Sequence, residues 1–197
     1  MMVPTIRSRP TYPGLRPLVA ARCNLFAVEG AGAAAVLRLL AEAPPGFADR
    51  TEVVLAAAAP EDEAALRDAG ARVHVCVDAD AALDTLDLLL SSATMGTRLQ
   101  VAGGEGFVGR VVRRGIDHCI DPRSVLTEHA GTLARRVQCV HCKTFTEAVT
   151  TSLFECPGCG NLLLVRDHFS RRLAAFQGVC VNAEDPAERP HPEEVYR

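Results

Sequence analysis

Two pairs of cysteines carry the clearest chemical signal in this chain of 197 residues. Each pair has the spacing Cys-x2-Cys, and thirteen residues separate the second cysteine of the first pair from the first cysteine of the second. A turn with this spacing directs two thiolates at one point, and two such turns complete a tetrahedral four-sulfur site. We therefore predict one metal ion bound by Cys139, Cys142, Cys156 and Cys159.

Four thiolates suit zinc, and they equally suit a single iron of the rubredoxin type. Zinc is favoured, because most Cys-x2-Cys ribbons hold a structural zinc that stabilises a module too small to have an adequate core. Iron would instead make the module a one-electron carrier. Two disulfides and four buried thiols are the alternatives to a metal. Disulfides fit poorly with four further, dispersed cysteines, namely Cys23, Cys76, Cys119 and Cys180.

The residues around the cysteines complete this prediction. The segment 143–155 is long enough for a hairpin, with one strand leaving the first pair and one returning to the second. Gly158 and Gly160 are expected to give the second turn the positive φ angles that it needs. His141 lies inside the first pair but is surplus to four cysteine ligands, so we expect either a solvated side chain or one that contacts a ligand without binding the metal.

Two glycine-rich turns, Glu29–Gly32 and Gly103–Gly106, are candidates for phosphate binding. Each lies between a predicted strand and a predicted helix, where backbone N–H groups can bind a phosphate. The first is not G-x-G-x-x-G, since Ala35 stands at the third glycine position. Glu29 also places a negative charge where a pyrophosphate would lie. We assign no cofactor-binding residue to either turn, and their capacity to bind a nucleotide stays open.

The sequence offers no catalytic residue. The six histidines are dispersed, and no pair of them combines with a carboxylate in the pattern that holds an oxygen-activating iron. The formal net charge of −3 also argues against a protein that binds polyanions. No apolar run approaches the roughly 20 residues that cross a membrane, and the first 22 residues lack the apolar core of a secretory signal. We expect a cytoplasmic protein.

Alternating elements must position these residues. Apolar runs predict strands over 24–28, 51–56, 72–77 and 99–102, and helical patterns follow them over 33–40, 60–69, 83–90 and 107–118. Strands separated by helices of this length predict a doubly wound α/β domain with a parallel sheet. A small four-cysteine module, of the zinc-ribbon or rubredoxin-like type, follows it.

The boundaries follow from this pattern. We expect an N-terminal extension over 1–22, the α/β domain over 23–130, the metal module over 131–181 and an extended tail over 182–197. Within the module, Leu162–Val165 is a predicted strand, and Arg166 opens a predicted helix that runs through Phe176 and stops at Gly178. The polar segment from Arg166, Asp167 and His168 to Arg172 is a candidate docking surface, because arginine is enriched in interface hot spots. A solvated helix face and a nucleic-acid contact are the alternatives.

The α/β segment resembles the pyridine-nucleotide domain of ferredoxin reductases. The resemblance lies in the order of strand, glycine turn and helix that ends in Val101–Val108 and Arg113–Ile116. That family has Cys-Gly-Pro after its fourth strand, whereas this chain has Ala102 and Gly104 at the cysteine and proline positions. The resemblance therefore implies the fold of a degenerate nucleotide-binding domain, without hydride chemistry.

The C-terminal segment resembles the corresponding domain of the DmmA-type subunit of bacterial dimethylamine monooxygenase. The two cysteine pairs carry this resemblance together with the segment from Leu164 to Phe176. It implies an NAD(P)H-dependent, multi-subunit enzyme that converts dimethylamine and oxygen to methylamine and formaldehyde. Other subunits would hold flavin, iron–sulfur clusters and the oxygen-activating iron.

Three functions follow from these observations. The leading hypothesis is a non-autonomous subunit of such a monooxygenase, which docks on the oxygenase and reductase components through the segment 166–172 and the tail. The second is a stand-alone electron carrier of the rubredoxin type. The third is a zinc-ribbon module that binds another protein or a nucleic acid.

Overall fold

The computed structural model describes residues 8–185, 187 and 189–197, and they form two compact units. One unit comprises Tyr12–Gly131, and the other comprises Thr132–Arg197 with the described residues before Tyr12. Each unit contains one five-stranded sheet.

The first unit is built on a parallel sheet with the strand order β3-β2-β1-β4-β5. Its strands are β1 (Cys23–Glu29), β2 (Thr51–Ala56), β3 (Arg72–Cys76), β4 (Thr97–Gly103) and β5 (Leu126–His129). Four of these strands match the predicted runs, and β5 is an addition. The chain order reverses between β1 and β4, which is where doubly wound sheets usually bind ligands, at the carboxyl ends of the strands.

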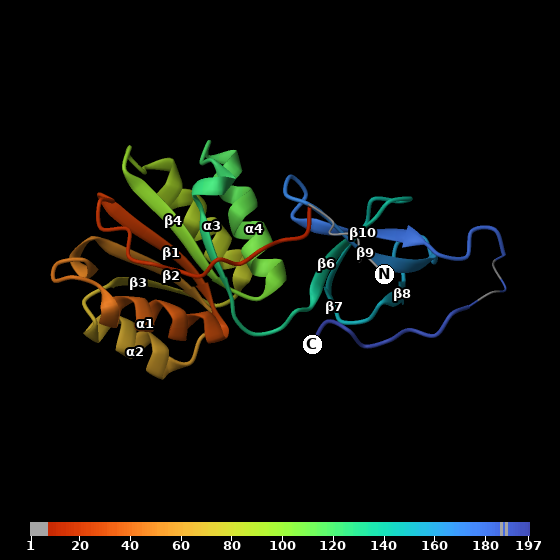
Figure 1. Cartoon of the computed structure of the whole chain (residues 1–197), viewed down its shortest axis with the longest axis horizontal. Coiled ribbons are helices and arrows are strands. Elements are labelled where there is room, and N and C mark those ends of the chain that lie inside the picture. Colours follow the sequence, from red (N-terminus) through yellow and green to blue (C-terminus); the bar gives the residue numbers. More distant parts are fainter. Residues whose placement is uncertain (1–7, 186, 188) are drawn as a thin grey trace, which may run out of the picture. The chain divides into compact units, whose positions relative to one another are not determined.

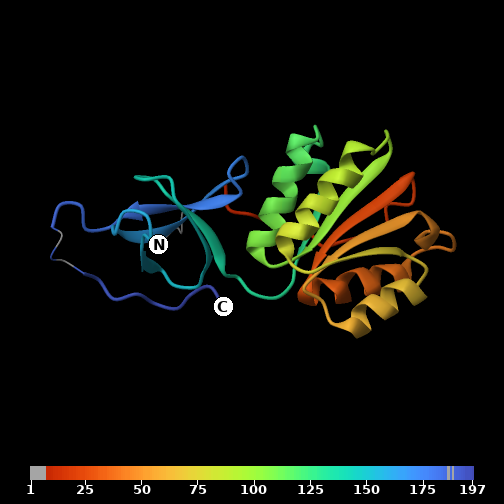
Figure 2. The same ribbon diagram turned by 180° about the vertical axis from the view of Figure 1, so that it is seen from behind.

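Helices cover both faces of this sheet, as Figures 1 and 2 show from opposite sides. The helices are α1 (Ala33–Glu42), α2 (Pro60–Asp68), α3 (Ala79–Ser91) and α4 (Glu105–Asp117), with short 3-10 turns at Gly30–Gly32, Ala48–Arg50 and Pro122–Ser124. One core lies under α1 and α2 around Phe26 and Leu39, and the other lies under α3 and α4 around Leu86 and Val108. The doubly wound α/β prediction is confirmed.

The second unit is a small mixed sheet with the order β7-β6-β10-β9-β8. Its strands are β6 (Arg135–Cys139), β7 (Phe145–Val149), β8 (Leu153–Glu155), β9 (Leu162–Ser170) and β10 (Ala175–Cys180). Two hairpins, β6–β7 and β8–β9, carry one cysteine pair each in their turns. This unit is the expected four-cysteine module.

The helix predicted over 166–176 is wrong. The predicted strand at Leu162 instead continues to Ser170, the chain turns, and β10 runs back beside β9. Gly178 lies inside β10 rather than stopping a helix. A Cβ atom on Gly178 would lie 2.9 Å from Leu163 Cδ1 and 3.0 Å from Val137 Cγ1, so this glycine lets β10 pack against its neighbours.

The last residues of the chain bind to the same unit. Glu194 forms an isolated bridge with Thr151, and Thr150 O accepts hydrogen bonds from Val195 N (3.0 Å) and Tyr196 N (2.9 Å). The ring of Tyr196 packs on the Arg135 guanidinium, and Arg135 Cζ lies 3.9 Å from the centroid of that ring. This part of the predicted tail is therefore engaged within its own unit.

Candidate metal centre

The two cysteine turns have the same backbone geometry. In the first, Lys143 N donates to Cys139 O (3.0 Å) and Cys139 N donates to Thr144 O (2.9 Å). In the second, Gly160 N donates to Cys156 O (2.9 Å) and Cys156 N donates to Asn161 O (2.9 Å). The residue after each second cysteine is left-handed, with φ 67° at Lys143 and 72° at Gly160. Two local turns of one type therefore present two thiols each.

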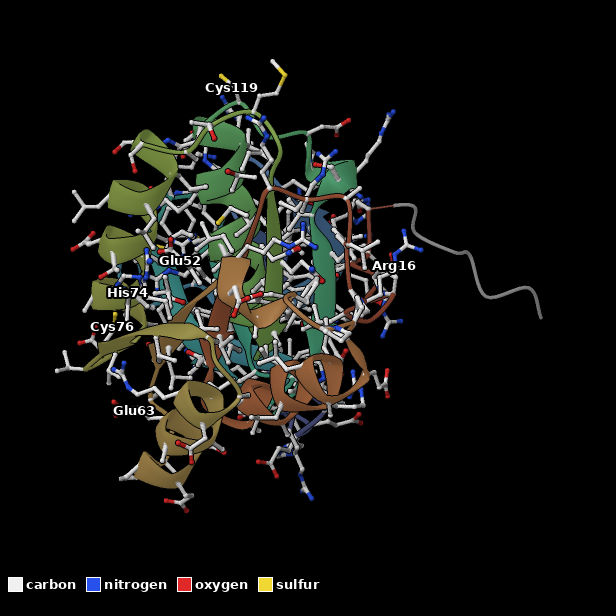
Figure 3. The ribbon with its side chains drawn as sticks, turned by 90° about the vertical axis from the view of Figure 1, so that its left-hand side faces the viewer. Arg16, Glu52, Glu63, His74, Cys76 and Cys119 are labelled. Carbon is white, nitrogen blue, oxygen red and sulfur yellow. The ribbon has the colours of Figure 1, made fainter. Side chains whose placement is uncertain are left out.

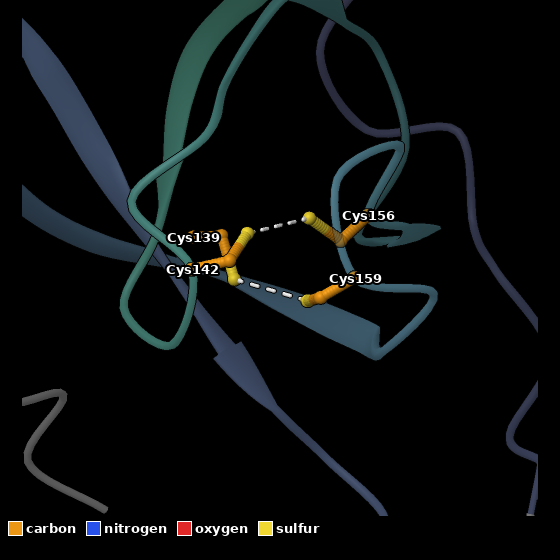
Figure 4. Close-up of side chains that lie close together, drawn as sticks. All are labelled: Cys139, Cys142, Cys156 and Cys159. Carbon is orange, nitrogen blue, oxygen red and sulfur yellow. Dashed lines mark hydrogen bonds between the residues drawn. The ribbon is translucent and has the colours of Figure 1, made fainter.

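These turns bring the four sulfurs together (Figure 4). Cys142 Sγ lies 3.5 Å from Cys156 Sγ, Cys139 Sγ lies 3.8 Å from Cys159 Sγ, and all four lie within 4.8 Å of one another. Four sulfurs placed about 2.3 Å from one zinc are about 3.8 Å apart, whereas a disulfide needs about 2.05 Å. The donor set and its spacing fit one tetrahedral metal ion, and all eight cysteines are free thiols.

Gly158 has a different role from the one expected. Gly160 has the predicted positive φ, but Gly158 is not among the left-handed residues. A Cβ atom on Gly158 would lie 2.2 Å from Thr144 Oγ1 and 3.1 Å from Cys142 Sγ. The missing side chain thus lets the second turn approach the first closely.

Thr144 is a site residue that the sequence did not reveal. Its hydroxyl lies 3.2 Å from Cys142 Sγ. This hydroxyl and the Thr144 backbone N–H lower the pKa of Cys142 to about 6. The Asn161 N–H lowers the pKa of Cys159, but burial and the three neighbouring thiols outweigh it and raise that pKa to about 12. The Cys142 thiolate therefore forms readily, whereas a metal ion must displace the proton of Cys159.

The four ligand candidates differ in exposure. Cys139 and Cys156 are buried and pack with Leu163, whereas Cys142 and Cys159 are half-buried. The side chain of His141 is exposed. The site is therefore closed on the side of the sheet and open to solvent at the second cysteine of each turn.

The other cysteines lie apart from this cluster. Cys76 is buried on β3, and Cys119 is exposed after α4 (Figure 3). Cys23 is half-buried, and burial followed by the charge of Glu52 raises the pKa of its thiol. Cys180 Sγ lies 3.6 Å from Asn182 Oδ1. Within the part of the chain that the structure describes, the four clustered cysteines are the only group of three or more metal-ligating side chains.

The glycine turns lie at the carboxyl ends of β1 and β4. The half-buried Glu29 carboxylate accepts a hydrogen bond from Gly104 N (3.3 Å), immediately before α4. Burial raises the pKa of Glu29 above its usual value, although Gly104 and Arg110 act in the opposite direction. A Cβ atom added to Gly32 would lie 2.4 Å from Ala102 O, and a Cβ atom added to Gly103 would lie 3.0 Å from the Cβ atom of Glu29. The glycines thus serve close packing, and Glu29 occupies the N-terminus of α4.

The length and polarity of the helices also bear on function. Among the described residues, the helices are too short or too polar to span a membrane.

Asp167, part of the polar segment 166–172, faces inward and binds Arg135 (2.8 Å). The guanidinium of Arg135 lies between the rings of Phe176 and Tyr196, 3.9 Å from each centroid. This buried cation was not apparent from the sequence, because its partners are 32 to 61 positions away.

Comparison with known proteins gives matches in both units. The family model described as dimethylamine monooxygenase subunit DmmA-like, N-terminal domain, matches residues 4–125, and its C-terminal counterpart matches residues 136–179. The heme-dependent oxidative N-demethylase delta subunit of Ectopseudomonas mendocina (strain ymp) is 37% identical over 109 residues. These residues are 54% of this chain and 61% of that relative, so the chain spans about three fifths of the relative's length.

Proposed function

Since the chain belongs to the DmmA-like family of dimethylamine monooxygenase subunits, we propose that it is a non-autonomous subunit of an oxidative N-demethylating oxygenase. The observation that carries this proposal is the match of both family domains, in order, together with the four clustered cysteines that the second domain contains. The relative named as a delta subunit supports the idea of a complex with several different chains.

The proposed reaction converts dimethylamine, O2 and NAD(P)H with one proton to methylamine, formaldehyde, NAD(P)+ and water. Other subunits would hold the flavin, the iron–sulfur cluster and the oxygen-activating iron. Glu29 supports assigning NAD(P)H to another subunit, because its carboxylate lies at the α4 N-terminus, where it would repel a phosphate. This function places the subunit in the cytoplasm, because NAD(P)H is supplied there and cysteines stay reduced there.

We assign the four cysteines to one metal ion, with zinc favoured. The ion would cross-link the two hairpins β6–β7 and β8–β9 and so fix the module that this subunit presents to its partners. The small cores of the module support this role. One groups Val137, Val149, Val165 and Phe176, and the other is built around the cysteines themselves.

Electron relay is the second candidate function, and one observation favours it. Cys142 and Cys159 are half-buried and reach the solvent side of the site, so that a partner could approach two of the four sulfurs. With iron in the site, the module could pass one electron between the reductase and oxygenase components.

The proposed function is tested by reconstitution. The full chain is mixed with the oxygenase and reductase components, and formaldehyde release and NAD(P)H consumption are followed with dimethylamine as the substrate. We expect no turnover by this chain alone, and a loss of at least tenfold when it is omitted from the mixture. Full activity without this chain would contradict the proposal.

The metal is identified by elemental analysis and by a visible spectrum of protein purified without added metal. We expect one zinc per chain and no visible colour. A stoichiometric iron with thiolate-to-iron absorbance that bleaches on reduction would instead support the relay. Protein with neither metal would contradict both assignments.

A further inference from the structure

The arginine-rich segment of the module lies on strand β9 and the following turn, and this geometry separates its exposed side chains from those that face the core. Successive residues of a strand point to opposite faces. The pairing of β9 with β10 shifts between Val165 and Phe169, but the burial of the side chains still alternates along this stretch. On β9, Val165 is buried and Asp167 and Phe169 are half-buried on the inner face, whereas Arg166 and His168 are exposed on the outer face. Arg171 and Arg172, in the following turn, are also exposed. We call Arg166, His168, Arg171 and Arg172 the cationic face.

Asp167, the single acidic residue of the segment, does not lie on the cationic face. The Asp167 carboxylate binds the buried Arg135 at 2.8 Å and lies 3.9 Å from Arg9. Among the described residues, no carboxylate lies within ion-pair distance of Arg166, Arg171 or Arg172. Three arginines are therefore exposed without a counter-ion among the residues that the structure describes.

The turn that carries Arg171 and Arg172 is fixed in place. Arg136 Nη1 donates to Leu173 O at 2.6 Å and to Ala174 O at 3.5 Å. Leu173 N also donates to Ser170 O at 3.1 Å. Because this backbone is already ordered, a partner that binds the turn pays little of the entropy of ordering a loop.

Apolar side chains continue the same face toward the other end of β9. Leu164 and Val179 are paired across β9 and β10, so both point outward with Arg166, and both are half-buried. Apolar side chains beside arginines are typical of protein interfaces, in which arginine is enriched and lysine is depleted. This chain has one lysine, Lys143, against twenty arginines.

We propose that the cationic face docks on a carboxylate-rich surface of another subunit of the complex. The inference rests on the proposed function, because it requires that such a complex exists. It replaces the contiguous segment 166–172 by the four exposed residues of the cationic face, and it excludes Asp167. The adjoining apolar residues and the net charge of −3 favour an acidic protein surface over a nucleic acid.

Zero-length cross-linking tests the contact directly. Carbodiimide joins an amine to a carboxylate as an amide, so arginine is silent and the single lysine gives a low background. In a Lys143→Arg background, the Arg166→Lys variant should form a cross-link to an aspartate or glutamate of a partner subunit, identified by mass spectrometry. Arg98→Lys in the same background is the matched control, since Arg98 is an exposed arginine of the α/β unit, and it should give none.

Affinity gives the second readout. The Arg166→Glu/Arg171→Glu variant should bind the partner subunits at least tenfold more weakly at 50 mM salt, and the difference should shrink at 500 mM as screening increases. Arg98→Glu should bind like the wild type. Circular dichroism and metal content equal to those of the wild type show that the variants are folded.

The outcomes separate the two proposals. A wild-type chain that binds no other subunit overturns the proposed function and this surface with it. A wild-type complex that the double variant joins with unchanged affinity overturns the surface alone, as does an equal cross-link yield from Arg98→Lys. Binding of a labelled DNA or RNA strand that the double variant loses would assign the face to nucleic acid and overturn the protein partner.

Discussion

At the scale of single residues, the free energy that an ion pair contributes in this protein depends on how deeply its two members are buried. Arg135 retains 3% of its side-chain exposure and lies between two aromatic rings, with Asp167 as its anion. Arg136 binds Glu147 at 2.6 Å, but this carboxylate is 56% exposed. Removing a partner from a buried ion leaves an uncompensated charge, whereas an exposed pair contributes little.

Asp167→Asn should therefore lower the free energy of unfolding of the metal module by about 3 kcal/mol, the low end for a broken buried pair. The low end applies because Asp167 itself is 39% exposed. Urea unfolding at constant metal content measures the change. Glu147→Gln is the control and should cost less than about 1 kcal/mol. Equal losses in the two variants would contradict this account of Arg135.

Two glutamates of the α/β unit should give opposite pH dependences. Burial raises the pKa of Glu29 above its usual 4.5, so the stability that it contributes is present below pH 4.5 and is lost as the pH rises. Burial also acts to raise the pKa of Glu128, but hydrogen bonds from Arg38 and Leu15 N outweigh it and lower that pKa. The stability that Glu128 contributes is thus present above pH 4.5 and is lost as the pH falls.

We accordingly expect Glu29→Gln to gain stability relative to the wild type between pH 4 and pH 7. Glu128→Gln should lose stability over the same interval. Urea unfolding followed by the helical circular dichroism signal reports on this unit, because the described helices all belong to it. The same sign of change in both variants would show that the two carboxylates do not differ as the structure indicates.

At the scale of elements, β7 contains a local irregularity that stores strain. The register of β6 and β7 shifts between Arg135 and Val137, and Ala148 opposite this shift has a φ of 54°. A left-handed residue is typical of a β-bulge, where glycine is favoured because a Cβ atom is costly. Ala148 is exposed, so its methyl group contributes little packing in return.

Ala148→Gly should raise the free energy of unfolding of the module by about 0.5–1 kcal/mol, because the strain exceeds the added entropy of the unfolded chain. Release of the metal to a chromogenic chelator during urea unfolding measures it. Ala183→Gly makes the same change in an exposed loop with no left-handed φ. It should destabilise slightly, and a gain in both variants would argue against strain at Ala148.

The strand pairing of β10 explains why the helix predicted over 166–176 is wrong. Residues 166–176 include helix-favouring alanines and a cluster of arginines, and these local preferences predict a helix. Ala175 instead pairs with Ser170, and Phe176 pairs with Phe169 at a ring distance of 5.0 Å. Pairing with β9 on one side and β6 on the other satisfies the backbone of β10, so tertiary contacts override a weak local preference.

At the scale of the whole molecule, the two units differ in what stabilises them. The α/β unit has a core on each side of its sheet, whereas the metal module has two small clusters, one of them formed around the cysteines. A module of this size is usually unfolded without its metal.

Chelation should therefore remove hydrogen-exchange protection from β6 to β10 and leave it in the α/β unit. Cys142→Ser should have the same effect in the presence of metal, and the exposed Cys119→Ser should have none. Exchange measured by mass spectrometry on the full chain resolves the two units. Persistent protection of β9 and β10 after complete loss of metal would show that the module has a sufficient core without it.

The sequence alone determined the features that local rules govern. Each cysteine pair lies within one turn, so spacing is enough to predict its geometry, and alternating strands and helices with short connections predict the doubly wound unit. The family resemblance also followed from contiguous residues. The tertiary structure decided what depends on residues distant in the chain: Thr144 between the two turns, Glu29 at Gly104, the burial of Arg135, and the strand in place of a helix. The contacts that set the first three features span 14 to 75 positions, and the strand depends on pairing of Phe176 with Val137, 39 positions earlier, so no local preference encodes these features.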